Sequence, residues 1–342
     1  MCYDSSFPQE YESCSGRTEC TDGQACLFFS KIQAGGGTKN KSARSKVEQF
    51  RRDFVTLARD AGRSYATVAD SMRIARYFLN YLRDNGIKLR HTDSIKTRHL
   101  IGYLQFRKEQ GISVRSIQNE RSVIRGILNQ AGRYKMAAPD NPLLSNKALG
   151  LEESNRAGTK LPLNPEEFQK AFMKVEKNNR GVAAVMLLSY TLGLRNKEAV
   201  ESCKSVMTWK RAIESGQDSV RVVFGTKGGR PRNTVIVNRD AVRRAINYAE
   251  SVMKENNGKL IDRPDIRKAL DTYRYHVRRA GLTGEKAPHS MRYHFSQEAR
   301  AFYENKGYSE REIYAQVSMD LGHGDGRGRY VKQVYFRSDH DE

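Results

Sequence analysis

Apolar residues in the first half of the chain recur at helical spacing. Between residues 65 and 86 they follow steps of three and four, at Val68, Met72, Ala75, Leu79 and Leu82. Such steps place one apolar stripe along a helix, which predicts a helix that is buried on that face and closed by Asn85-Gly86. The same period predicts a leading helix over 44–61, another over 97–110 and a third after Ser113. The four helices predict one small unit over residues 43–136.

The pattern breaks after this unit and then resumes. Residues 137–162 contain three prolines and no sustained period, which is typical of a linker between domains. Asn164, Pro165 and Glu167 then supply a cap, a first-turn proline and a capping-box acid, so they predict the start of a helix. The apolar run Val182–Leu194 predicts a second helix, buried on all sides.

Strand signals occur once, in the second half of the chain. Two β-branched runs, SVRVVFG and NTVIVN, flank the segment TKGGRPR, which predicts a hairpin with Lys227 in its turn. Helical spacing returns over four segments: 239–256, 264–280, 290–303 and 309–321. The predicted fold class is therefore mainly α with a small antiparallel β-sheet. The predicted domains are a helical one over 43–136 and a second over 163–342, with a flexible N-terminal tail over 1–42.

The net charge of the chain indicates which class of molecule it binds. The chain has 60 Lys and Arg residues against 39 Asp and Glu residues, a formal net charge of +21. The tail holds five acidic and four basic residues, so the excess lies in the predicted domains. Such an excess favours a polyanionic partner, nucleic acid before membrane. The arginines that the pattern places largely outward fit solvated surface and DNA contact equally: Arg73, Arg76, Arg115, Arg121 and Arg125.

Neither a membrane segment nor a metal site is predicted. No apolar run approaches the roughly 20 residues that span a bilayer, and the first residues lack the regions of a secretory signal, so we expect a cytosolic protein. Four cysteines lie in the tail, at Cys2, Cys14, Cys20 and Cys26. Their spacing differs from that of zinc knuckles and no histidine is near, which favours a flexible tail over a metal site. Cys203 is predicted to be a small core residue.

Cationic side chains and tyrosines gather in motifs of the second half. The candidate site residues are Arg195, Lys227, His289, Arg292, His323 and Tyr335. Guanidinium groups can neutralise the non-bridging oxygens of a phosphodiester, while lysine and imidazole groups can move protons. A tyrosine needs such cations nearby to act as a nucleophile near neutral pH. No acidic cage accompanies the set, so we expect neither a metal nor another cofactor.

These motifs resemble those of the tyrosine recombinases, the phage-type integrases. GLRNKEA is similar to their first arginine motif, with Glu198 three positions after the arginine, where we expect it to orient Arg195. HSMRYHF is similar to their H-x-x-R box, and its His294 is expected to support the site from outside the catalytic set. Lys227 matches their hairpin lysine, and LGH supplies His323. The resemblance covers residues 163–336 and implies that the helical unit is a DNA core-binding domain.

The position of the nucleophile departs from the family's pattern. Where family members place a tyrosine after the LGH motif, this chain has Lys332. The candidates are Tyr330 and Tyr335, seven and twelve residues after His323. The glycine-rich segment GDGRGR can absorb three extra residues as a longer loop, and an apolar residue precedes Tyr335 as in the family. Tyr335 is therefore favoured over Tyr330.

The resemblance implies a site-specific DNA recombinase or integrase. Tyr335 would attack the scissile phosphate to form a 3′-phosphotyrosyl link, and Lys227 would protonate the leaving 5′-oxygen. Four side chains would clamp the phosphate and manage protons: Arg195, Arg292, His289 and His323. The implied partners are double-stranded DNA carrying specific sites, three further copies in a homo-tetramer, and DNA-bending accessory proteins. The implied setting is the nucleoid in the cytoplasm of a bacterium, and the gene would belong to a mobile genetic element.

Two alternatives remain, of which the first shares the same residues and the second only the fold. A nicking and resealing enzyme like the type IB topoisomerases would relax supercoils without recombining sites. A catalytically idle DNA-binding protein of the same fold would bind DNA without cleaving it.

Overall fold

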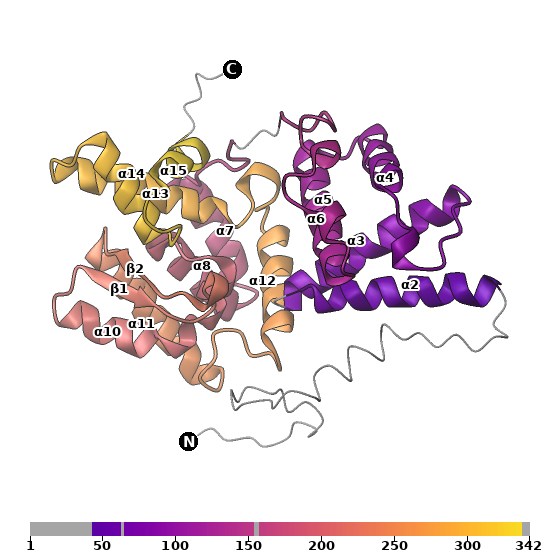
Figure 1. Ribbon diagram of the computed structural model, residues 1–342. Helices are drawn as coiled ribbons and strands as arrows, with labels where there is room; N and C mark the ends of the chain where they lie inside the picture. Colours follow the sequence, from indigo (N-terminus) through magenta and orange to yellow (C-terminus); the bar gives the residue numbers. More distant parts are fainter. Residues whose placement is uncertain (1–42, 63–64, 154–156, 337–342) are drawn as a thin grey trace, which may run out of the picture. The chain divides into compact units, whose positions relative to one another are not determined.

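The computed structural model describes residues 43–62, 65–153 and 157–336, which form two compact units divided after Asn155 (Figure 1). The predicted fold class, mainly α with a small antiparallel sheet, is confirmed. The predicted tail over residues 1–42, with its four cysteines, lies outside the described residues. Among the described helices, none combines the length and the apolar character needed to cross a membrane.

The first unit is a helical bundle around one core. Its helices are α2 (Ala43–Asp60), α3 (Tyr65–Asp84), α4 (Thr97–Glu109), α5 (Val114–Gln130) and the short α6 (Tyr134–Ala137). The four long helices each bury a large side chain in this core, for example Phe54, Phe78, Tyr103 and Ile124. Helix α2 packs against α3 and α5, as the shared apolar period predicts.

The segment after α5 packs into the same core. Leu144 and Leu151, which fall in the predicted linker, are both buried there. Arg121 donates a hydrogen bond to the carbonyl oxygen of Leu144 at 2.7 Å, and Arg125 donates to the last carbonyl oxygen of α6 at 2.9 Å. The prediction that these two arginines point largely outward is therefore wrong, because backbone carbonyl groups compete for them. Arg115 is exposed as predicted.

The second unit surrounds a buried central helix. Its elements are α7 (Pro165–Glu176), α8 (Arg180–Leu192), α9 (Asn196–Val200), α10 (Val206–Glu214), β1 (Ser219–Val222), β2 (Arg232–Val235), α11 (Arg239–Glu255), α12 (Ile266–Arg279), α13 (Ser290–Asn305), α14 (Glu310–Asp320) and α15 (Gly328–Tyr335). Helix α8 packs against α7, α11 and α13, and its residues 182–186 are wholly shielded from solvent. Its all-round apolar sequence fits this central place (Figure 1).

Local signals in the sequence set two boundaries that position the site. Asn164 and Glu167 form the predicted capping box at the start of α7, with reciprocal bonds of 2.7 and 3.0 Å. Strands β1 and β2 form the predicted hairpin, in which Val222 lies opposite Arg232. The intervening loop carries Lys227 in a short turn. A separate apolar cluster joins α13, α14 and α15 and seats the C-terminal end of α15.

Candidate active site

Arg195 stands at a sharp turn between two helices. Helix α8 ends at Gly193, whose left-handed backbone (φ 58°) suits glycine, and Arg195 caps the start of α9. The carboxylate of Glu198 accepts hydrogen bonds from the backbone N–H of Arg195 at 2.8 Å and from its guanidinium at 2.6 Å. Glu198 therefore orients Arg195 as the motif predicts. The side chain of Glu198 is fully buried, whereas that of Arg195 keeps 22% of its surface exposed.

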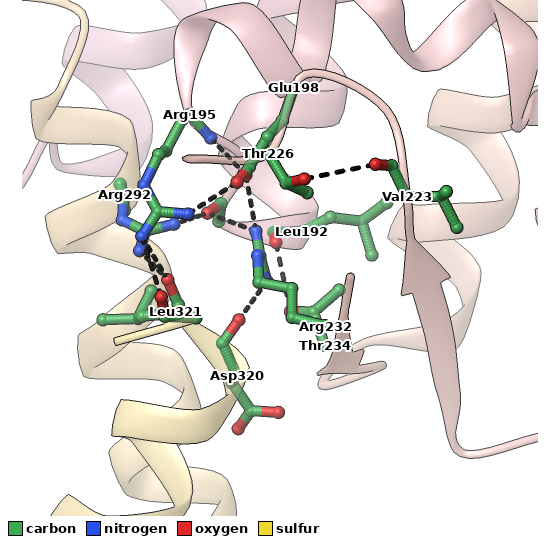
Figure 2. A network of polar contacts seen from close by, with 12 residues as sticks. Leu192, Arg195, Glu198, Val223, Thr226, Arg232, Thr234, Arg292, Asp320 and Leu321 are labelled. Carbon is green, nitrogen blue, oxygen red and sulfur yellow. Dashed lines mark hydrogen bonds and ion pairs between the residues drawn. The ribbon is translucent and has the colours of Figure 1, made fainter. Parts of the chain in front are cut away.

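Arg292 lies in the first turn of α13 and is almost wholly buried. Its guanidinium donates to the carbonyl oxygen of Gly193 at 2.6 Å and to that of Leu321. The same Leu321 oxygen accepts from Arg195 at 2.9 Å, so the two arginines lie side by side (Figure 2). The Nε of Arg292 donates to the hydroxyl oxygen of Tyr335 at 3.1 Å. The first arginine motif, the H-x-x-R box and the last helix therefore meet at one place.

Tyr335 ends α15 with its hydroxyl group held from two sides. Besides Arg292, His323 lies against it, with Nε2 at 3.2 Å from the hydroxyl oxygen. Burial, followed by the charges of Arg292 and Arg195, lowers the pKa of His323 to about 3. Its ring is therefore neutral at pH 7, and we assign Nε2 as the acceptor because Arg292 already donates to the tyrosine oxygen. The phenolic hydrogen thus points at a neutral base.

His289 immediately precedes α13 and lies near the ring of Tyr335. The two rings are 6.2 Å apart between centroids, and Tyr293 packs against Tyr335 at 4.6 Å. Burial, followed by the charges of Arg292 and Arg195, lowers the pKa of His289 to about 4. This histidine is also neutral at pH 7, although two arginines stand close by. His294 lies elsewhere, stacked on Tyr190 at 3.8 Å and outside the cluster.

Lys227 and Tyr330 take no part in these hydrogen bonds. Lys227 is exposed in the hairpin turn, and within the described residues no hydrogen bond or ion pair joins it to the cluster. Tyr330 lies in the first turn of α15, keeps 39% of its surface exposed, and contacts His323 ring to ring at 5.0 Å. Of the six candidate residues, the structure brings together Arg195, His289, Arg292, His323 and Tyr335.

A third arginine, which carries no motif in the sequence, also belongs to the cluster. Arg232, the first residue of β2, forms an ion pair with Glu198 at 2.8 Å and donates to the backbone oxygen of Asp320 (Figure 2). Burial by itself raises the pKa of Glu198, but the charge and hydrogen bond of Arg232, followed by the charge of Arg292, outweigh burial and lower that pKa to about 2. The alternation of inward and outward residues along β2 could have indicated the burial of Arg232, because Arg232 and the buried Thr234 share one face.

The cluster holds more positive than negative charge. Three guanidinium groups meet one ionised carboxylate, and two neutral imidazoles and a phenol complete the set. The carboxyl group of Asp320 accepts from the backbone N–H of Val235 and from Tyr303, and burial raises its pKa to about 6. Among the described residues, no group of three or more His, Cys, Asp or Glu side chains is arranged to hold a metal ion. The arrangement suits binding of an anion beside a tyrosine hydroxyl group.

Comparison with protein families finds two matches along the chain. A model described as "Phage integrase, N-terminal" matches residues 47–137, and a model described as "Integrase" matches residues 150–298. A search of curated protein sequences finds no match.

Solved structures share the fold at low sequence identity. A lambda integrase dimer bound to a COC′ core site is 13% identical with a TM-score of 0.56, over 93% of this chain and 88% of that chain. A lambda integrase tetramer bound to a Holliday junction is 16% identical with a TM-score of 0.55, over 93% and 86%. The Tn1549 transposon integrase in complex with a circular intermediate DNA is 13% identical with a TM-score of 0.52, over 83% and 94%.

Proposed function

Because the chain belongs to the tyrosine recombinase family, we propose that it is a site-specific DNA recombinase or integrase. It would cleave and rejoin DNA strands through a covalent 3′-phosphotyrosyl intermediate formed by Tyr335. One observation carries this proposal. The hydroxyl group of Tyr335 lies between an N–H donor of Arg292 and the Nε2 atom of His323, at 3.1 and 3.2 Å. A phenol held in this way can lose its proton as it attacks.

The reaction comprises cleavage and rejoining of one phosphodiester bond. The oxygen of Tyr335 attacks the scissile phosphorus, its proton passes to His323, and the bond from phosphorus to the 5′-oxygen breaks. Lys227 gives a proton to that leaving oxygen, from an exposed turn in which Gly228 and Gly229 follow it. Rejoining is the reverse attack by a 5′-hydroxyl group on the phosphotyrosine. Because the covalent link conserves the phosphodiester bond, no external energy source is needed.

Positive charge on the phosphate is the main contribution of the site. Arg292 uses three of its five N–H donors within the protein, which leaves two for the non-bridging oxygens. Arg195 is the more exposed of the pair and lies beside it. His289 is neutral before DNA arrives, but an adjacent phosphate favours the charged ring, so bound DNA raises the pKa of this histidine. The cage therefore gains positive charge as the reaction begins.

The first unit offers a second surface for DNA. A groove of about 440 Å³ between α2 and α3 is lined by Arg51, Arg52 and Arg76 together with apolar side chains. Guanidinium groups so placed can hold backbone phosphates, with the strong salt dependence of such contacts. The lambda integrase structures of this fold are bound to a core site and, as a tetramer, to a Holliday junction. We infer by analogy that the protein acts as a homo-tetramer on synapsed DNA in the bacterial nucleoid.

A suicide substrate tests the chemistry and the nucleophile together. A labelled duplex with the recombination ends of the encoding element, nicked beside the cleavage point, is mixed with the wild type, Tyr335→Phe and Tyr330→Phe in a metal chelator. We expect a covalent adduct that only Tyr335→Phe abolishes. An adduct abolished only by Tyr330→Phe would reassign the nucleophile. Relaxation of supercoils without recombination would favour a topoisomerase-like enzyme, and tight binding without any adduct would favour an idle DNA-binding protein.

A further inference from the structure

Arg232 lies beneath the turn before His323, and its guanidinium is directed at protein acceptors. It begins β2, five residues after Lys227, and its side chain keeps only 4% of its surface exposed. Its aliphatic part runs beneath Gly322, where an added Cβ atom would lie 2.4 Å from the Cδ of Arg232. The turn before His323 therefore packs directly on the aliphatic part of Arg232. Any effect on the reaction must pass through other residues.

The guanidinium of Arg232 joins three parts of the catalytic unit. It contacts Glu198 at 2.8 Å, the carbonyl oxygen of Gly193 at 3.3 Å and the carbonyl oxygen of Asp320 (Figure 2). The Gly193 oxygen also accepts from Arg292, and Glu198 also accepts from Arg195. Each of the two arginines beside the phosphate site thus shares an acceptor with Arg232.

The buried guanidinium groups of this cluster repel one another and need a negative charge beside them. Burial, together with the neighbouring charges of Arg292 and Arg195, lowers the pKa of Arg232 to about 10, while Glu198 acts in the opposite direction. The Glu198 carboxylate is the acid that offsets this group of guanidinium ions, and it must stay ionised to do so. Without Arg232 the buried Glu198 carboxylate would lose one of its two ion-pair partners, the other being Arg195. Removal of one partner from a buried pair is costly because the other charge stays uncompensated.

We propose that Arg232 is a positioning residue for strand cleavage. It holds the carboxylate of Glu198, which orients Arg195, and it shares the carbonyl oxygen of Gly193 with Arg292. This role rests on the proposed function. A lysine cannot replace the arginine fully, because one ammonium group cannot reproduce a planar fork that spans three acceptors. Arg232 also fixes the end of the loop that carries Lys227. The loop and the Arg195 motif are therefore both held by the contacts of Arg232.

The test compares cleavage with binding in four variants of the full chain. These are Arg232→Met, Arg232→Lys, the double variant Glu198→Gln/Arg232→Met, and the control Arg239→Met. The control arginine also bonds backbone oxygens, those of Ile213, Gly216 and Gln217, but lies outside the cluster. Single-turnover adduct formation on the nicked duplex is measured from pH 5.5 to 9 at saturating protein, and the Kd for DNA is measured separately.

We expect Arg232→Met to slow adduct formation about 10²-fold, with a Kd within about threefold of the wild type. Its loss should be largest at low pH, because Glu198, left with Arg195 and Arg292 as its charged neighbours, has a higher pKa and takes up a proton there. Arg232→Lys should be slowed about tenfold. Arg239→Met should cleave at the wild-type rate. A purely structural defect would not shift the pH profile.

Each outcome decides the role of Arg232. If Arg232→Met does not fold, the double variant carries the test, because it removes both buried charges at once. Slow cleavage with unchanged Kd in that variant supports the proposal. Wild-type rates in the Arg232 variants, or equal losses in Arg239→Met, overturn it while leaving the proposed function intact. A wild-type protein that binds DNA but forms no adduct would overturn the proposed function and this role with it.

Discussion

At the scale of single residues, the site depends on groups that are held neutral beside buried charges. His289 and His323 lie next to Arg292 and Arg195, and the pKa values of both rings fall to about 4 and about 3. Neutral rings can accept the phenolic proton of Tyr335, which a protonated imidazole cannot do. Bound phosphate would move the balance towards the charged form. The same residues can therefore begin the reaction as bases and continue it as cations.

This arrangement predicts that acid destabilises the catalytic unit. A histidine whose pKa is lower in the folded than in the unfolded protein contributes stability that is present above about pH 6.5 and is lost as the pH falls towards 4. His289, His294 and His323 all act in this direction. Asp320, whose pKa is raised to about 6, acts in the opposite direction as the pH falls from 6 to 4. Three histidines outweigh one aspartate, so we expect stability to fall.

The measurement is the melting temperature of the full chain between pH 7.5 and 4.5 without DNA. We expect a decrease on the order of 5 °C for the wild type. The double variant His289→Gln/His323→Gln should show a smaller decrease, because two of the titrating groups are gone. An equal decrease in both proteins would mean that other groups set the acid response.

Residues that carry a motif were predictable, and residues that support it were not. Arg195, His289, Arg292 and His323 stand in short signatures whose chemistry is visible in the sequence. Arg232 has no such signature, because its role depends on Glu198 and Asp320, which are distant in the chain and meet only in the folded unit. The strand's alternation marks it as inward-facing, but a buried arginine is rare enough that composition alone favours an exposed one.

At the scale of elements, the packing of α15 against segment 157–162 determines where the hydroxyl group of Tyr335 lies. Segment 157–162 runs beneath the end of this helix and is held by a bond from the N–H of Leu161 to the carbonyl oxygen of Glu285 at 3.0 Å. Gly158 lies in this segment, where an added Cβ atom would be 1.9 Å from the carbonyl oxygen of Val334 and 2.7 Å from the hydroxyl of Tyr293. Only glycine allows the helix to approach this closely.

We therefore predict that Gly158→Val displaces α15 and impairs cleavage. The branched side chain must push away the backbone next to Tyr335, which breaks the 3.1 and 3.2 Å contacts of its hydroxyl group. Adduct formation should fall at least about tenfold, with DNA affinity little changed. Thr159→Val, at the exposed neighbouring position, is the matched control. Rates that fall equally in both variants would refute a specific effect on the helix.

The partly buried arginines of α5 lead to a further prediction about local stability. Arg121→Met removes the 2.7 Å bond to the Leu144 carbonyl group and leaves that acceptor unpaired. The local free energy of unfolding should fall by about 1–2 kcal/mol. Amide hydrogen exchange should accelerate in α5 and in segment 137–151 of the full chain. Arg115→Met, an exposed arginine on the same helix, should leave exchange unchanged. Unaltered exchange in Arg121→Met would show that the segment is held by its apolar contacts alone.

The elements themselves were predictable to different degrees. Strong apolar periods predicted the helices of the first unit, and the β-branched runs around glycines predicted the hairpin. Helix α10 was not singled out, because it is short and lies between the arginine motif and the hairpin. The course of residues 137–151 was also hidden, since prolines indicate irregular backbone but do not reveal whether it packs against a core.

At the scale of the whole molecule, the excess of positive charge favours a polyanionic partner. The net charge of +21 and the arginine-lined groove of the first unit favour phosphate contacts along DNA. Such contacts release counterions, so the affinity must fall steeply as salt rises. The catalytic cluster adds few phosphate contacts, because its arginines donate largely to backbone and carboxylate oxygens of the protein. Most of the salt dependence should therefore come from surfaces outside the cluster.

The groove between α2 and α3 provides the test. Arg51, Arg52 and Arg76 line it. If each holds one phosphate, the triple alanine variant should reduce the slope of log K against log salt by about 0.9 per lost contact, or nearly three in all. The control Arg83→Ala removes an arginine at the end of α3 that is paired with Asp84, and it should leave the slope unchanged. An unchanged slope in the triple variant would mean that DNA lies on another face of the first unit. A lower slope together with normal adduct formation at low salt would separate binding from chemistry, because the groove would then anchor DNA while the buried arginines act only on the scissile phosphate.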